Sequence, residues 1–469
     1  MSKQKDLLKN TGIITIGKLS SQIVSFMLLP LYTSVLSTSE YGMVDLLLSY
    51  IQLLIPVINL QLDQALFRFL VTKRSDEGEC RIVISTMAFF FILQLTVYTI
   101  LFFSIQFFIN SPYKWFFLIN IIFSVFSSFV SNCARGLGNN VNYSVQSFIS
   151  VIATVLFNIL FLVVFKFGVN GMLMAYGIPG AISGVYGIIS LKCYRYISFR
   201  SVDKHRIREY YNYSIPLIPN QLAWWAMKAS DKTIINIFVS VAANGLIAVA
   251  SKFSSAYIMV YNLFNLAWAE SVVLHIDDPD GRDYIEDTIN MVFAIFSSIC
   301  FGIIGCIPVV FPLLVNHSYN EAYNLVPIYM ISVLFNAVVG LYSAIYVARK
   351  DTKAVAATSG IAAGINIIVD VALVGKIGVY AAPVSSAAGF LVVMVYRYFH
   401  SRKYIVVNIK NSLLLLSLIT GTAVLSLYYV NSTASNIVSF GICVVYAAVV
   451  NDRFLKKIIS SIKYKIKEG

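Results

Sequence analysis

Apolar stretches long enough to cross a lipid bilayer follow one another along nearly the whole chain, and charged residues lie inside several of them. Of the 469 residues, 58% are apolar and only 12% are charged. Continuous apolar runs of about 20 residues are typical of transmembrane α-helices, whereas membrane β-barrels show short alternating segments. The pattern therefore predicts an all-α polytopic membrane protein and excludes an ordinary soluble domain.

The expected topology has about 14 transmembrane spans joined by short loops. We place the spans at 11–34, 42–64, 82–109, 115–133, 144–165, 172–191, 213–238, 245–269, 287–313, 323–347, 355–374, 381–400, 411–430 and 436–452. Most of the 35 lysines and arginines fall on one side of this layout. Such a bias marks the cytoplasmic side, so both termini are expected in the cytoplasm. Because topology explains the net charge of +13, we do not expect nucleic-acid binding.

Cysteines and histidines give no sign of a metal site or a catalytic centre. The six cysteines contain no CxxC motif, and none falls in a predicted outer loop. The four histidines are scattered over loops and span ends without ligand spacing. We therefore expect no metal, no cofactor other than a coupling ion, and no enzymatic activity.

Short motifs recur about 210 residues apart. KFGVNG begins at Lys166 and KIGVYA at Lys376, and an Ala-Arg pair closes two predicted spans at Arg135 and Arg349. Matches at nearly one interval indicate duplication of a six-helix unit. Because six is an even number, both copies should have the same orientation in the membrane. Chance similarity between short glycine-rich loops is the alternative.

The expected domains are two lobes of six spans each and a C-terminal extension. The boundaries are 1–205 for the first lobe, 206–403 for the second, and 404–469 for the two further spans and a basic tail. In folds built from such repeats, substrates bind between the lobes near the middle of the membrane. The tail has the pattern of an amphipathic helix on anionic lipids, and a simple topology anchor explains it equally well.

Lysines inside the spans are the first candidates for substrate binding. An ionised side chain facing lipid costs roughly 2.5–3.5 kcal/mol, so these residues should face a water-filled cavity that favours anions. Lys228 and Lys232 are four residues apart and share one helix face, with Asp231 beside them. They can hold phosphate oxygens, or Asp231 can neutralise one of them in a structural ion pair. The complete cationic set is Lys18, Lys228, Lys232 and Lys252.

Carboxylates inside the spans have two interpretations that the sequence leaves open. They can bind a coupling proton or sodium ion, or they can pair with the lysines. These residues are Asp45, Asp63, Asp231 and Asp370. Arg68 and Arg135, at cytoplasmic span ends, can make the first contact with an incoming phosphate or can be ordinary topology signals.

Several segments resemble the polysaccharide-biosynthesis transporters, the O-antigen flippases of the Wzx type. The matching segments are residues 10–42, 134–138 (ARGLG) and 230–257 (SDKTIINIFVSVAANGLIAVASKFSSAY). The superfamily also holds multidrug antiporters and lipid II flippases. The resemblance implies two six-helix bundles in a V around a central cavity, and Asp231, Lys232, Gly245 and Lys252 match its pattern. Leu246 departs from it, because a tyrosine is usual there.

The residues and the resemblance together predict a flippase of the bacterial inner membrane. It would move a polyprenyl-pyrophosphate-linked oligosaccharide from the inner to the outer leaflet by alternating access, among membrane lipids and with a polysaccharide polymerase as a partner. One alternative is a multidrug or cation antiporter on the same fold, whose cavity should be net acidic. The other is a membrane glycan polymerase or acyltransferase, for which no catalytic set is visible.

Overall fold

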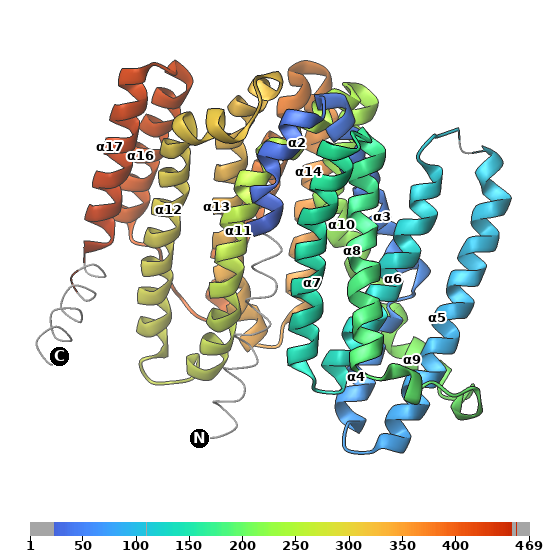
Figure 1. The fold of residues 1–469 in the computed structure, drawn as a ribbon. Coiled ribbons are helices and arrows are strands. Elements are labelled where there is room, and N and C mark those ends of the chain that lie inside the picture. Colours follow the sequence, from blue (N-terminus) through green and yellow to red (C-terminus); the bar gives the residue numbers. More distant parts are fainter. Residues whose placement is uncertain (1–22, 109, 453–455, 457–469) are drawn as a thin grey trace, which may run out of the picture. The chain divides into compact units, whose positions relative to one another are not determined.

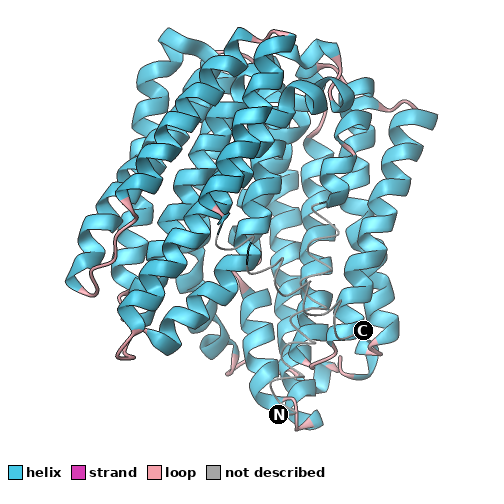
Figure 2. Cartoon of the chain, turned by 90° about the vertical axis from the view of Figure 1, so that its left-hand side faces the viewer, coloured by secondary structure: helices cyan, strands magenta, loops and turns pink. Residues whose placement is uncertain are grey.

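The computed structural model describes residues 23–108, 110–452 and 456. Every element in this part of the chain is a helix, and no strand occurs among these residues. Figure 2 shows the helices joined by short loops. Eleven helical segments are long and apolar enough to cross a membrane. One of them, Lys353–Lys403, contains two of the predicted spans. The all-α polytopic fold is confirmed, and the count of 14 spans stays a prediction.

The chain divides into two compact units, residues 1–233 and 234–469. The division falls inside one helix, Ile218–Phe238. The three-part division expected from the sequence, with boundaries after residues 205 and 403, stays a prediction. Figure 1 labels helices of both units where there is room.

Most helices of the first unit overlap the predicted spans. They are α2 (Leu29–Val35), α3 (Thr38–Ile58), α4 (Leu62–Lys73), α5 (Glu77–Ile105), α6 (Lys114–Gly136), α7 (Asn140–Asn158), α8 (Gly168–Ser190), α9 (Ile207–Ser214) and the first part of α10 (Ile218–Phe238). A π-helical segment, Ile159–Val164, extends α7.

Helices of the second unit follow the predicted spans equally well. They are the last part of α10, α11 (Val241–His275), α12 (Gly281–Leu314), α13 (Val326–Ala348), α14 (Thr352–Ile377), α15 (Ala381–His400), α16 (Asn411–Val430) and α17 (Thr433–Val450). The last two helices pack on α12. The Tyr446 hydroxyl on α17 joins the three, because it lies 2.7 Å from the Ser297 hydroxyl and 2.6 Å from that of Ser417. Apart from Lys456, the basic tail after Asp452 lies outside the described residues.

The predicted duplication is visible in matching loops of the two units. Asn139 caps α7 and Asp351 caps α14, each accepting a backbone N–H three residues later. Gly168 and Gly378 have φ values of +55° and +56° in the corresponding KFGVNG and KIGVYA loops. The same helix pairs pack in each unit: α6 and α7 against α8, and α13 and α14 against α15.

One predicted span differs from the structure. The sequence favours a single span at 42–64, but α3 ends at Ile58 and α4 begins at Leu62. Leu60 and Gln61 both have positive φ, which L-residues other than glycine rarely adopt. The Asn59 side chain stabilises the break by accepting the Gln61 N–H at 2.8 Å. As a result, Asp63 lies in the first turn of a new helix.

Candidate functional site

The candidate residues from the sequence divide between the two units. Lys18 lies outside the described residues, and so does the side chain of Lys228 on α10. Lys252 on α11 and Asp370 on α14 belong to the second unit. The first unit holds the remaining candidates, which are Asp45, Asp63, Arg68, Arg135, Asp231 and Lys232.

Lys232 on α10 pairs with Asp45 on α3. Its ammonium nitrogen lies 2.7 Å from Oδ2 of Asp45 and donates to the Ser49 hydroxyl at 3.0 Å. The two charged side chains are 19% and 23% exposed. Of the two sequence interpretations of Asp45, ion coupling and lysine pairing, the structure displays the pairing.

Aromatic side chains strengthen the same junction of α10 with α3. The Trp225 indole N–H donates to the Ser49 carbonyl at 2.7 Å, and the Tyr50 hydroxyl lies 3.0 Å from that of Thr233. The Trp225 and Tyr50 rings lie 6.2 Å apart. The charged pair is thus one part of a larger polar and aromatic contact.

The intramembrane carboxylates of α10 and α14 are almost completely buried. Asp231 on α10 is 6% exposed and Asp370 on α14 is 0% exposed. One turn before Asp370, the Asn366 amide donates to the hydroxyls of Ser385 and Ser386 on α15, at 3.2 Å each. Neither carboxylate therefore faces lipid, as the cost of burying a charge in hydrocarbon requires.

Asp63 receives hydrogen bonds from three side chains. Asn59 donates to Oδ1 at 3.1 Å, Gln64 donates to Oδ2 at 3.1 Å, and Ser128 on α6 donates to Oδ2 at 2.9 Å. Asp63 is 7% exposed and lies at the N-terminus of α4, where the helix dipole favours a negative charge. Polar donors therefore hold both oxygens of this buried side chain in place.

Asp63 forms part of the wall of a cavity of about 400 Å³ within the first unit. The walls are hydroxyls and amides from α4, α6, α7 and α8, with one carboxylate and one guanidinium. The lining is Asp63, Gln64, Ser127, Ser128, Ser131, Asn132, Arg135, Tyr143, Gln146, Ser147, Ser150, Val151, Thr154 and Ser183.

Arg135 lines this cavity, whereas the other cytoplasmic candidate, Arg68, is exposed and not part of its lining. The Arg135 guanidinium carbon lies 4.3 Å from the Phe67 ring centroid and 5.5 Å from that of Tyr143. Cation–π contact with two rings fixes the position of the guanidinium without using its N–H groups.

Sequence reasoning missed the neutral part of the lining. Tyr143, Ser147, Ser150 and Thr154 follow one another at helical spacing along α7, among apolar residues. On α6, Ser128, Ser131 and Arg135 have the same kind of spacing. A search for polar stripes inside apolar spans, rather than for charges alone, can find both.

Sequence reasoning also missed a buried guanidinium in the second unit. Arg397 on α15 is 2% exposed and donates to neutral acceptors only. On α13 these are the Val339 carbonyl at 3.1 Å and the Ser343 hydroxyl; on α14 they are the Val355 carbonyl at 3.3 Å and the Thr358 hydroxyl at 3.0 Å. The side chain joins three helices.

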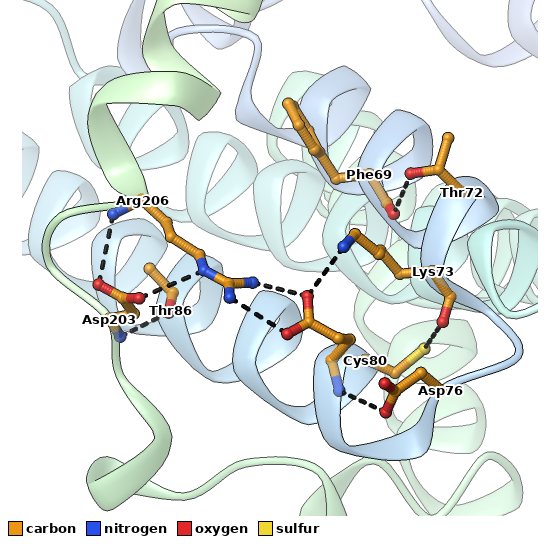
Figure 3. A network of polar contacts seen from close by, with 9 residues as sticks. Phe69, Thr72, Lys73, Asp76, Cys80, Thr86, Asp203 and Arg206 are labelled. Carbon is orange, nitrogen blue, oxygen red and sulfur yellow. Dashed lines mark hydrogen bonds and ion pairs between the residues drawn. The ribbon is translucent and has the colours of Figure 1, made fainter.

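An ionic cluster fixes the connector between α8 and α9 to α5 (Figure 3). Arg206 binds both carboxylate oxygens of Glu79, at 2.7 and 3.1 Å, and Lys73 approaches the same group at 3.2 Å. Arg206 also pairs with Asp203 at 3.3 Å, and the Asp203 backbone N–H donates to the Thr86 hydroxyl at 2.9 Å. Glu79 raises the pKa of the Arg206 guanidinium.

Among the described residues, no three histidine, cysteine or acidic side chains gather as a metal site would require. The polar features of this part of the chain are suited to binding and to helix positioning.

Comparison with known families identifies the type of protein. The model of the family described as polysaccharide biosynthesis protein matches residues 7–269, more than half of the chain. The chain belongs to this family. No curated protein matches the sequence of this polysaccharide biosynthesis protein.

Solved structures give the fold of this polysaccharide biosynthesis protein. The lipid II flippase MurJ in its inward closed conformation has a TM-score of 0.71 and 15% identity, covering 96% of this chain and 100% of its own. An inward-facing multidrug resistance MATE family transporter of the MOP superfamily has a TM-score of 0.63 and 12% identity, covering 83% and 97%. A mutant of the Vibrio cholerae MATE transporter VcmN has a TM-score of 0.54 and 13% identity, covering 85% and 96%.

The chain therefore has the fold of multi-pass membrane transporters and flippases of the MOP superfamily. The solved structures named above are transporters and flippases rather than enzymes. The family prediction made from the sequence motifs is confirmed.

Proposed function

We propose that the protein is a flippase for oligosaccharides linked to a polyprenyl pyrophosphate, such as the repeat unit of O-antigen or a similar surface polysaccharide. It moves them from the inner to the outer leaflet of a bacterial inner membrane, with both termini in the cytoplasm. A polysaccharide polymerase that extends the delivered units is part of this proposal.

The observation that carries the proposal is the match to MurJ over 96% of the chain in a member of a polysaccharide biosynthesis family. The MATE structures leave 15–17% of the chain uncovered, which is about the length of residues 404–469. The MurJ match is thus the more complete of the two. The family description, polysaccharide biosynthesis protein, supports a cargo that belongs to polysaccharide synthesis.

The charges inside the spans have a role in this proposal. The diphosphate must leave water to cross the membrane, and the ammonium groups of Lys18, Lys228, Lys232 and Lys252 offset that cost. An inside-negative potential also favours outward movement of an anion, by roughly 2.3 kcal/mol per charge per 100 mV. A proton or sodium ion bound at a buried carboxylate, Asp231 or Asp370, can supply further energy.

In this proposal, the Lys232–Asp45 ion pair is the state of Lys232 in the absence of substrate. With Asp45 as its partner, Lys232 has a compensating negative charge beside it while no substrate is bound. A phosphate group of the substrate can take the place of the Asp45 carboxylate as that partner. Exchange of one anionic partner for another is the molecular event that we assign to Lys232.

A bacterium that carries this gene provides the test. Deletion should abolish surface glycan and leave lipid-linked oligosaccharide on the inner leaflet, and the intact gene should restore display. The K228A/K232A variant should fail to restore display at normal protein level. The matched control is K376A, a lysine that is exposed in the structure.

Normal surface glycan in the deletion strain would refute the proposed function. Normal display with K228A/K232A would refute only the role of those lysines. A drug-susceptibility panel on the same strains tests the multidrug alternative, which requires that deletion sensitise the cell to cationic drugs. Exchange of sodium for potassium, and separately a protonophore, tests the coupling ion.

A further inference from the structure

The cavity of the first unit has two charged groups at separate places on a neutral polar wall. Ser128, which donates to Asp63, precedes Arg135 by seven residues on α6. At a rise of 1.5 Å per residue, the two positions are about 10 Å apart along the helix. No ion pair joins Asp63 to Arg135 in the part of the chain that the structure describes.

Arg135 presents unused donors to this cavity. Among the described residues, no carboxylate pairs with it and no oxygen accepts a hydrogen bond from it; its contacts are the Phe67 and Tyr143 rings. A guanidinium carries five N–H donors in a planar fork that fits phosphate or carboxylate oxygens. The fork is therefore fixed in position and available to an anion.

The opposite charge has spare acceptor capacity. An ionised carboxylate has about four acceptor sites, and Asp63 uses three of them for Asn59, Gln64 and Ser128. Between Asp63 and Arg135, the serine hydroxyls and the Asn132 and Gln146 amides form the wall. Such a wall suits a ligand that carries many hydroxyl groups.

The size and charge of the cavity exclude simpler contents. Its volume of about 400 Å³ lies in the range of small-molecule sites and far exceeds the roughly 30 Å³ of one water molecule. A bare cation is disfavoured because Arg135 shares the cavity. A bare phosphate uses the Arg135 end and leaves the hydroxyl-lined remainder unfilled.

We propose that this cavity binds a glycosyl phosphate, with the phosphoryl oxygens on Arg135 and the sugar hydroxyls on the wall that ends at Asp63. The proposal rests on the proposed function, because it assigns a docking site in the first unit to the head of the lipid-linked cargo. Arg135 fixes the phosphate, and Asp63 accepts one hydroxyl of the first sugar. The site therefore selects for the sugar next to the phosphate.

Binding to the purified full-length protein in detergent tests the site. The probes are a panel of hexose 1-phosphates, with inorganic phosphate and methyl hexosides as half-ligands, measured by calorimetry. At least one hexose 1-phosphate should bind more tightly than either of its halves. R135Q should weaken its binding about tenfold or more, because it removes a charge-assisted contact to phosphate.

Two further variants separate the ends of the site. D63N should weaken the hexose 1-phosphate several-fold and leave inorganic phosphate within twofold. The matched control is R349Q, the corresponding arginine of the second unit, which pairs with Asp277 at 2.7 Å and should change binding less than twofold. R135K, which keeps the charge, should retain part of the affinity and guards against a folding defect in R135Q.

A short-chain polyprenyl pyrophosphoryl hexose distinguishes the two sources of the ligand. Tighter binding than the free hexose 1-phosphate supports a docking site for membrane-linked cargo, and weaker binding supports a site for a soluble sugar phosphate. Equal loss with R349Q and R135Q, unchanged binding with R135Q, or no binding of any probe at millimolar concentration would overturn the proposal. Because these assays need no transport, they can succeed even if the deletion strain displays normal glycan.

Discussion

The ammonium group of Lys232 lies 2.7 Å from the Asp45 carboxylate, joining α10 to α3 inside the first unit. The next residue, Thr233, is the last of that unit, and α10 continues into the second. The pair therefore fixes the helix on which the chain leaves the first unit, at the position where it leaves. An event that separates these two charges alters the attachment of that helix.

Removing both partners of the pair should cost less than the sum of the two single removals. D45N and K232Q should each lower the free energy of unfolding by about 1–2 kcal/mol, because each leaves a partly buried charge unpaired. The double variant D45N/K232Q should lose about 1 kcal/mol less than the sum of the two. Chemical unfolding in mixed detergent micelles measures all three values.

The control pair is Asp452 and Lys456, which are 52% and 75% exposed and should show almost no coupling. Strict additivity at Asp45 and Lys232 would contradict the structural importance of the contact.

At Arg397, we expect the chemically dissimilar replacement, methionine, to destabilise the protein less than the similar one, lysine. Its acceptors already have other partners, because Ser343 and Thr358 also donate within their own helices and the carbonyls are helical. R397M removes a buried charge and leaves no polar group unsatisfied, so the loss should stay within about 1 kcal/mol. R397K keeps the charge but cannot reproduce the fork, and should lose about 2–3 kcal/mol.

Thermal unfolding of the purified protein measures the order of these two variants. The matched controls are R402K and R402M, because Arg402 is an exposed arginine that follows Arg397 closely in the chain. For both controls we expect the free energy of unfolding to change by about 0.5 kcal/mol or less. A lysine variant as stable as wild type, with a destabilised methionine variant, would show that positive charge rather than geometry is needed at Arg397.

Much of the fold follows from local signals in the sequence. Apolar length predicted the helices, and the structure shows local caps at their starts: Ser37 and Glu40 form a capping box before α3, and Ser240 caps α11. The repeated loops predicted the duplication, and both contain a glycine with positive φ. These features depend on neighbours in the chain, so a pattern of residues is enough to find them.

The partners of the charged residues could not be predicted in this way. The sequence left Asp45 with two interpretations, because only packing decides that Lys232 on a distant helix approaches it. Neither residue of the break, Leu60 or Gln61, is a glycine, although Pro56 lies in the last turn of the helix before it. Arg397 lies near the end of the predicted span 381–400, where a positive charge commonly marks topology, yet it is buried and donates to residues of α13 and α14. Each of these depends on contacts between residues far apart in the chain.

Release of the connector should follow loss of Glu79. This carboxylate holds both Arg206 and Lys73, and the Arg206 pairs are partly exposed. E79Q should therefore free the connector at a cost of about 1 kcal/mol and raise the rate of trypsin cleavage after Arg200 or Lys204 by about fivefold. Limited proteolysis of the purified protein, read by mass spectrometry, measures the rate.

The control variant is E209Q, because Glu209 is an exposed residue on α9. Equal cleavage of E79Q and wild type would show that the connector is held by other contacts.

Asp351 gives a prediction for the dependence of stability on pH. The Tyr404 hydroxyl, the Ala354 N–H and Lys403 hold the pKa of this carboxyl below its usual value of 3.8. Because the folded state favours the ionised form, the stabilisation is complete above that value and is lost as the pH falls through the lower pKa of the folded protein. Asparagine caps a helix as well as aspartate does, and Asn139 caps the corresponding helix in the first unit, so D351N tests the charge alone.

We expect D351N to have a lower Tm than wild type from pH 5 to 7, and the difference to shrink below about pH 4. D351A, which also loses the cap, should have a lower Tm than D351N at every pH. A difference between wild type and D351N that stays constant down to pH 3 would mean that the carboxylate charge does not contribute.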